Sequence, residues 1–251
     1  MKRSRPNKRI TQLLHLWHKH LGLYAAIFII LLSLTGIALN HTGTLNLNNL
    51  YISSDWLLDH YNVAEPSTLK HFPVNKTAVY QADDLLIINN NVITPIQQAI
   101  VGAVDQGDLV IVALKNKLLL IEDNAHVIAI FDQKDGVPTK INRIGLSADQ
   151  QVIFETETKL ITVNDSFSQW SRFNNSEIIW STSHAIDKAL RKELNKRYRA
   201  HIIQLETLVL DLHSGRFFGQ YGELFFDFIA ILLIFLAISG VFVWFKLNRS
   251  P

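Results

Sequence analysis

Two long uncharged runs lie near the two ends of the chain. Residues 21–39 carry no charged side chain, and residues 224–245 are apolar except for Asp227 near their start. At 1.5 Å per residue, the first run as a helix is about 28 Å long, close to the hydrocarbon thickness of a bilayer. The pattern therefore predicts two transmembrane helices, at residues 21–41 and 224–245.

Between these runs the hydrophobic pattern changes to an alternation of apolar and polar residues. From about Thr77 to Phe173 the period is two, which is typical of β-strands, and turn-forming Asn, Asp and Gly separate the segments. Two hairpin-like units, at 109–131 and 151–173, resemble each other, which favours repeated antiparallel sheets or propeller-like blades. The predicted strands are 85–88, 109–114, 117–121, 126–131, 151–155 and 159–163.

Three further elements complete the predicted architecture. A short helix is expected at 56–61, an amphipathic helix at 183–199, and a strand at 202–212 that leads into the second membrane helix. The fold class is a membrane protein in which two transmembrane helices bracket a β-rich extracytoplasmic domain with some helix. Its parts are 1–20, a basic cytoplasmic segment; 21–41, helix 1; 42–223, the β-rich domain; 224–245, helix 2; and 246–251, a cytoplasmic tail.

The distribution of charge orients these helices. Residues 1–20 contain six Lys or Arg and no acid, and Lys246 and Arg249 follow the second run, whereas residues 42–223 hold 16 basic and 21 acidic residues, a net charge of −5. By the positive-inside rule both termini are cytoplasmic, so the middle segment is expected outside the cytoplasm. A cleaved signal peptide is disfavoured, because the apolar core is long and no A-x-A-like site follows it in 37–43.

The composition narrows the possible chemistry. The absence of cysteine excludes disulfides, thiolate metal sites, a cysteine nucleophile and covalent c-type haem attachment. The middle domain contains no phosphate loop, nucleophile elbow or HExxH motif. Nothing in the sequence predicts a nucleic-acid partner. A metal or cofactor must therefore be held by other ligands, among which the ten histidines are the main candidates.

Five of the histidines lie at the predicted membrane edges. His15, His18 and His20 lie at the cytoplasmic end of the first run, His41 follows its outer end, and His213 precedes the second run. Ionisable residues at such positions are functional candidates by default, although the first three also fit a simple basic flank. Imidazoles at both ends fit axial ligation of haem iron. His18 and His41 are about 35 Å apart along one helix, so they cannot bind the same iron.

Small residues and two charged groups add to this picture. Small side chains at helical spacing allow close approach of a second helix or of a flat macrocycle. Arg216 suits either a haem propionate or a lipid phosphate, and Asp227 is either interfacial or paired. Residues at this helical spacing form one stripe rich in small side chains on each predicted helix. The stripes are His18, Gly22, Ala26, Ile29, Ser33, Gly36 and Asn40 in the first helix, and Ala230, Leu233, Ala237, Gly240 and Trp244 in the second.

Motifs at both ends resemble those of the PepSY-associated transmembrane family. They are His-Lys-His-Leu-Gly at 18–22, Leu-Thr-Gly at 34–36 and Leu-Asn-His at 39–41, followed by Leu-Asp-Leu-His-Ser-Gly-Arg-Phe-Phe-Gly at 210–219 and Ile-Ser-Gly-Val-Phe-Val-Trp at 238–244. Members of this family include haem-containing ferric reductases of the bacterial inner membrane. The resemblance implies haem b held by His18, His41 and His213. His20 stands where the family usually has tryptophan, so the inner ligand could be His18 or His20, while His15 lies outside the motif.

The resemblance implies a haem-dependent ferric reductase. It would carry electrons across the membrane from a cytoplasmic or quinone donor, and reduce periplasmic Fe³⁺ to Fe²⁺ for a ferrous iron transporter. With two helices and three motif histidines, haem ligands from two chains are expected, which predicts a symmetric homodimer in the lipid membrane. The alternatives are a non-catalytic scaffold or accessory protein of an iron transporter, and a non-haem metal sensor.

Overall fold

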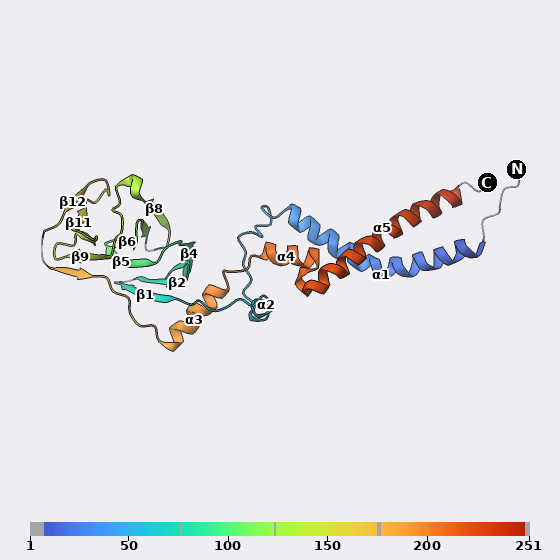
Figure 1. The fold of residues 1–251 in the computed structure, drawn as a ribbon, viewed down its shortest axis with the longest axis horizontal. Coiled ribbons are helices and arrows are strands. Elements are labelled where there is room, and N and C mark those ends of the chain that lie inside the picture. Colours follow the sequence, from blue (N-terminus) through green and yellow to red (C-terminus); the bar gives the residue numbers. More distant parts are fainter. Residues whose placement is uncertain (1–7, 76, 123, 175–176, 249–251) are drawn as a thin grey trace. The chain divides into compact units, whose positions relative to one another are not determined.

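The computed structural model describes residues 8–75, 77–122, 124–174 and 177–248, which form two compact units. One unit, here called the membrane unit, combines the chain up to Ile52 with the chain from Ile203 onward. The other, the β unit, comprises Ser53–Ile202. Figure 1 shows the course of the chain through both units.

The membrane unit is built from three helices and a short 3₁₀ turn. Helix α1 spans Lys8–Asn40, α4 Leu205–Ser214, the turn η2 Arg216–Phe218, and α5 Gln220–Asn248. Helices α1 and α5 pack side by side in opposite directions, and α4 lies against α1 (Figure 1). Most of their large apolar side chains face outward, as expected of helices surrounded by lipid.

Both predicted membrane helices are confirmed. The stretches long and apolar enough to cross a bilayer are Leu16–Asn40 and Gln220–Phe242. The second begins four residues before the predicted start at 224, because the helix already starts after Gly219, whose φ of 74° does not continue a right-handed helix. The two helices bracket a β-rich middle region with some helix, so the predicted fold class is correct.

The predicted strand at 202–212 is wrong, because the chain forms helix α4 there. Its apolar residues also satisfy a helical spacing, and a short apolar run does not by itself distinguish the two periods. Gly215 ends the helix in the left-handed conformation, with φ 81°. The start of α4 is tied to the segment after α1, since the N–H of Leu205 donates to the carbonyl of Leu50 at 2.7 Å. Residues 42–52 and 203–223, predicted as parts of the β-rich domain, therefore fold with the membrane helices.

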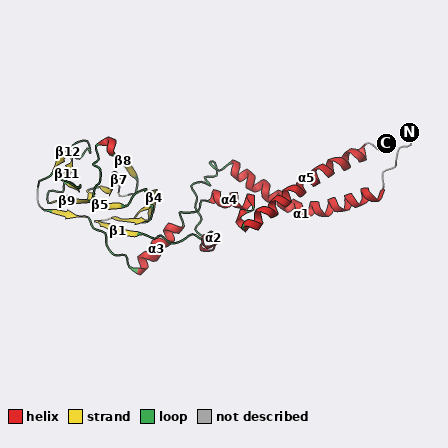
Figure 2. Cartoon of the chain, in the orientation of Figure 1, coloured by secondary structure: helices red, strands yellow, loops and turns green. Residues whose placement is uncertain are grey.

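The β unit consists of three antiparallel four-stranded meanders. A thirteenth strand, β13 (Ile178–Trp180), pairs with the first strand of the third meander. Figure 2 shows the strands in yellow. The first meander is β1 (Leu69–Val74), β2 (Thr77–Ala82), β3 (Leu85–Ile88) and β4 (Asn91–Pro95); the second β5 (Ile100–Gln106), β6 (Leu109–Leu114), β7 (Leu118–Glu122) and β8 (Val127–Phe131); the third β9 (Arg143–Ser147), β10 (Val152–Glu155), β11 (Leu160–Val163) and β12 (Trp170–Arg172).

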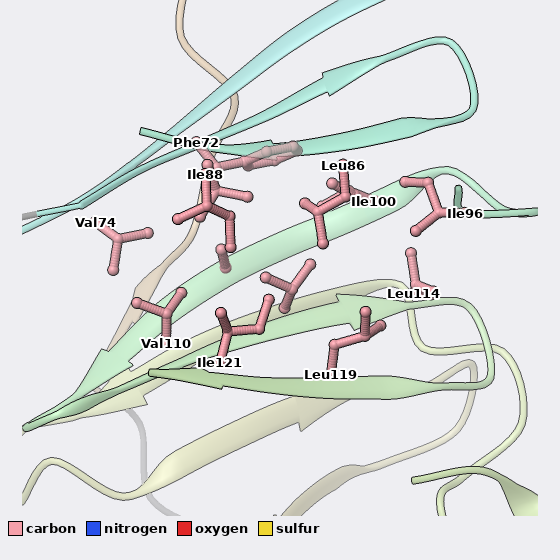
Figure 3. Packing of buried hydrophobic residues seen from close by; sticks show 13 residues of the cluster. Phe72, Val74, Leu86, Ile88, Ile96, Ile100, Val110, Leu114, Leu119 and Ile121 are labelled. Carbon is pink, nitrogen blue, oxygen red and sulfur yellow. The ribbon is translucent and has the colours of Figure 1, made fainter. Parts of the chain in front are cut away.

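The meanders stack through two apolar clusters. The first cluster lies between the first and second meanders, where Phe72 and Ile88 face Val110 and Ile121 (Figure 3). The second lies between the second and third meanders and is centred on Phe154, which is fully buried. The predicted repeat at 109–131 and 151–173 thus lies within two of three blade-like units. A 3₁₀ turn, η1 (Gln133–Asp135), lies between the second and third of them.

Two helices flank the strands of the β unit. The predicted short helix is confirmed as α2 (Asp55–His60), and the predicted helix at 183–199 is shorter, as α3 (Lys188–Arg199). Helix α3 starts five residues after the predicted start at 183, because Asp187 is its N-cap. The Asp187 carboxylate accepts a hydrogen bond from the N–H of Leu190 at 2.8 Å. Leu194 of α3 is buried against the first meander.

A histidine pair joins β1 to the chain that returns from β13. The ring of His71 stacks on Tyr80 at 4.8 Å between centroids and contacts His184 edge-on at 6.2 Å. The N–H of His184 donates to the carbonyl of His71 at 2.7 Å. Burial, with a smaller contribution from His184, lowers the pKa of His71 below its ordinary value of 6.5. The unfolded chain therefore binds more protons than the folded one as the pH falls below about 6.5, so acidification destabilises this junction.

We expect this junction to open more readily at pH 5.5 than at pH 7.5. Hydrogen exchange of the peptides covering β1 and β13–His184 in the full-length protein, corrected for the intrinsic pH dependence of exchange, should accelerate on acidification. His71→Phe keeps an aromatic ring on Tyr80 and should abolish most of that change. His126→Phe, at an exposed position, should leave it intact. Equal acceleration in all three proteins would contradict the role of His71.

Candidate functional site

His213 lies in the last turn of α4 and packs against α1. Its Nδ1 lies 2.8 Å from the Oγ1 of Thr35, and its Cε1 lies above Gly36, where an added Cβ would be 3.5 Å away. The left-handed Gly215 turns the chain directly after this histidine. The ring is therefore held between α4 and α1 by one polar contact and one glycine.

His18 has a similar arrangement on a different pair of helices. It lies on α1 and packs against α5, with its Nδ1 3.2 Å from the Oγ of Ser239. A Cβ added to Gly240 would lie 3.3 Å from its Cε1. Each histidine thus rests on a hydroxyl residue followed by glycine on a neighbouring helix.

The two histidines occupy different depths of the membrane unit. Along α1, His18 and Thr35 are 17 residues apart (35 − 18), which corresponds to about 26 Å. His18 lies near the first end of the span Leu16–Asn40, and the contact with His213 lies near the other end. The two rings therefore define two separate levels rather than one site.

The structure places the other sequence-predicted histidines elsewhere. His41 directly follows the end of α1 and is exposed, and His20 is exposed on α1 two residues from His18. Counted from Thr35, His41 is six residues further, or about 1.7 turns, so it does not share the face that contacts His213. His213 therefore contacts α1 at Thr35, and His41 lies away from this contact. The side chain of His15 lies outside the described residues.

The two predicted charged groups also have defined surroundings. The Nε of Arg216 lies 3.1 Å from a carboxylate oxygen of Asp211 and donates to the Oγ of Ser214 at 3.1 Å. About half of the Arg216 side chain is exposed, so a propionate or a lipid phosphate would share the guanidinium with Asp211. Asp227 is exposed on α5, about two turns after its start.

The contact between α1 and α5 overlaps only in part with the predicted small-residue stripes. Among the described residues of these two helices, the buried ones are Ala25 and Thr35 on α1 and Gly222, Phe226, Ile229 and Leu236 on α5. Aromatic rings fill the interface, since Phe28 contacts Phe225 and Phe226 with centroids 5.5 and 6.0 Å apart. Among the predicted stripe residues, His18, Gly22, Ala26, Gly36, Leu233 and Gly240 are at least partly buried, whereas Ile29, Ser33, Asn40, Ala230, Ala237 and Trp244 are exposed.

Sequence reasoning missed Thr35 and Ser239 as contacts of the histidines. The available signal was the hydroxyl residue directly before a glycine, which occurs as Thr35-Gly36 and Ser239-Gly240 within the two motif regions. It also missed the close packing of Gly215 on Gly222, where an added Cβ on Gly222 would lie 2.1 Å from the carbonyl oxygen of Gly215. That contact fixes the corner between α4 and α5.

The donor atoms at the two levels fit axial ligation of haem iron. Within the part of the chain that the structure describes, no hydrogen bond is made by the Nε2 of His18 or of His213. A neutral imidazole nitrogen is a strong ligand for haem iron, and the chain has no cysteine to compete. Each chain offers one such nitrogen at each level.

The fold and this geometry define a class: a membrane protein with two apolar helices around a β-rich region and a histidine at each end of the helix interface. The family model of the PepSY-associated TM region matches residues 1–249, and the chain belongs to this family. The searches of curated proteins and of solved structures gave no match.

Proposed function

We propose that this protein carries electrons across the bacterial inner membrane through haem b and reduces periplasmic Fe³⁺ to Fe²⁺. The observation that supports this proposal is the repeated placement of a histidine, at two depths about 26 Å apart, with one ring nitrogen held and the other without a hydrogen bond among the described residues. A scaffold would not require that arrangement twice.

The residues of the chain have distinct tasks in this proposal. Haem, when bound, supplies one-electron redox chemistry. His213 would hold it at the outer level and His18 at the inner level, and the rings of Phe28, Phe225 and Phe226 exclude water from the interface between them. One electron from a cytoplasmic flavin or a membrane quinol would convert one Fe³⁺ to one Fe²⁺ without acid–base chemistry. A ferrous iron transporter would then take up the product.

The orientation follows from the charges of the flanking segments. Six Lys or Arg and no acid lie in residues 1–20, so both termini are placed in the cytoplasm and the β unit in the periplasm. The outer level at His213 would then be the one that faces Fe³⁺. The two-helix layout resembles that of VciB, a small protein that promotes ferrous iron uptake.

A second copy of the chain would supply further histidines that could hold haem at each level. At each level, one histidine of the described chain is held by a hydroxyl residue of a neighbouring helix, whereas bis-imidazole ligation would require two histidines. A two-fold axis parallel to the helices would bring equivalent histidines together at both depths. The exposed His41 and His20 remain candidate second ligands for the outer and inner levels. We therefore include a homodimer in the proposal.

The decisive experiment is the visible spectrum of the full-length protein in detergent, first oxidised and then reduced with dithionite. Low-spin b-type haem should give a Soret band with sharp α and β bands on reduction, and ferric citrate should reoxidise it with formation of Fe²⁺. A colourless protein from cells supplied with haem precursor would contradict the proposal. Bound metal without a Soret band would instead indicate a non-haem sensor.

A second candidate function is protein binding by the β unit. Three large apolar side chains are exposed on strands at sheet edges: Ile128 and Ile130 on β8, and Ile179 on β13. Such strands are available for pairing with another chain. A scaffold of this kind would keep its partner when both His18 and His213 are replaced, whereas an electron carrier would lose its cofactor.

A further inference from the structure

We infer that Thr35 and Ser239 are positioning residues that keep the proton of each imidazole on Nδ1, so that Nε2 of His213 and of His18 presents its lone pair. The inference rests on the proposed function only for the identity of the ligand, which would be iron. The position of the proton follows from hydrogen bonds within the protein.

At the outer level, the hydrogen of the Thr35 hydroxyl is donated to a backbone carbonyl and is not available to His213. Its Oγ1–H donates to the carbonyl of Leu31 at 2.7 Å, in the back-bonding geometry common for threonine in helices. A hydroxyl has one hydrogen and two lone pairs, so the same oxygen faces Nδ1 of His213 as an acceptor. Nδ1 must then carry the hydrogen, which leaves Nε2 of the neutral ring unprotonated.

At the inner level, the same logic applies to a different residue on a different helix. The Oγ–H of Ser239 donates to the carbonyl of Leu236 at 3.1 Å, so the oxygen accepts from Nδ1 of His18 at 3.2 Å. The two levels share no residue in these hydrogen bonds. The recurrence of a hydroxyl whose own proton is engaged argues against a chance contact.

The glycine after each hydroxyl residue completes the arrangement. An added Cβ would be 3.5 Å from Cε1 of His213 at Gly36, and 3.3 Å from Cε1 of His18 at Gly240. The rings therefore lie close to the backbone of the helix that holds them, which limits their rotation. Hydrogen bonding of the distal ring nitrogen orients a metal-binding imidazole and makes it more basic, and its loss typically weakens metal affinity 10- to 100-fold.

The tautomer can be measured without any cofactor. Long-range ¹H–¹⁵N spectra of the haem-free, full-length protein in detergent, labelled at histidine and assigned with His213→Gln and His18→Gln, report which nitrogen carries the proton. We expect the Nδ1–H form for both rings. Thr35→Val should shift His213 towards the Nε2–H form, Thr35→Ser should restore it, and Ser239→Ala should change His18 alone. Ser33→Ala, at an exposed serine of the same helix, is the matched control.

Haem titration of the same variants separates this inference from the proposed function. Thr35→Val should weaken haem binding at least tenfold and alter the low-spin electron paramagnetic resonance signal, and Thr35→Ser should recover both. An Nε2–H ring in the unaltered protein, or unchanged affinity in Thr35→Val and Ser239→Ala, would overturn the inference. Nδ1–H rings in a protein that binds no haem would overturn the proposed function and leave the proton assignment in place.

Discussion

Replacing His213 by alanine should reduce the haem content of the purified protein to half or less. The imidazole that contacts Thr35 and Gly36 is the one proposed to hold haem at the outer level, and alanine supplies no ligand in its place. The inner level at His18 should keep its haem, because its contacts with Ser239 and Gly240 lie about 26 Å away along the helix. The pyridine haemochrome, measured per mole of protein, gives the stoichiometry directly.

Two further variants serve as a control and as a comparison for the haem content of His213→Ala. His126→Ala removes an exposed histidine of the β unit and should leave the haem content unchanged. His41→Ala tests the exposed candidate ligand, and a loss equal to that of His213→Ala would assign both to the same iron. The far-ultraviolet circular dichroism of all three variants should match the unaltered protein. A full complement of haem in His213→Ala would disprove the outer ligand.

Gly222→Ala should destabilise the membrane unit and displace His213, although the substitution adds a single methyl group. The new Cβ would lie 2.1 Å from the carbonyl oxygen of Gly215 and 2.7 Å from the Cβ of Phe218, and neither group can move without the backbone. Overpacking of this kind typically costs about 1–3 kcal/mol. Because Gly215 directly follows the last turn of α4, its shift also moves the histidine away from Thr35. Thermal unfolding in detergent and the haem content should both decline.

The matched control is Gly22→Ala on α1. An added Cβ at Gly22 has no described atom within 4 Å, and alanine is the better helix former by about 0.5–1 kcal/mol. This variant should unfold at the same temperature as the unaltered protein or slightly above it. If Gly222→Ala and Gly22→Ala unfold alike and retain equal haem, the corner between α4 and α5 does not position His213.

Most of the fold could be predicted from the sequence where a single period dominates. The two membrane helices and strands β3 and β6 match their predicted ranges closely, since long uncharged runs favour membrane helices and short apolar runs bounded by turn residues favour buried strands. Helix α4 could not be predicted, because a short apolar run fits both periods and its partner, α1, lies far away in sequence. The first meander was predicted only in part, because β2 buries the polar side chains of Thr77 and Gln81 and so lacks the continuous apolar run that marks β3.

The histidines of the candidate site could be predicted from the sequence, but the residues that contact their rings could not. His18 and His213 stand out because ionisable residues at membrane edges are rare. Thr35 and Ser239 do not, because hydroxyl residues are ordinary in membrane helices and their role depends on partners 178 and 221 residues away. The small-residue stripes match the helix contact only in part for the same reason, since the contact also includes Phe28 and Phe226. Whether His41 serves as a ligand is still a prediction.

The contacts that hold the two histidines form in a fixed order during biosynthesis. Ribosomes make α1 first, yet the ring of His18 has no support until Ser239 is synthesised, 221 residues later. The outer ring is on a helix made only after the whole β unit. A nascent chain can therefore hold His213 once α4 is made, but it can hold His18 only after α5 is made, so haem binding at the proposed inner level would follow synthesis of the last helix.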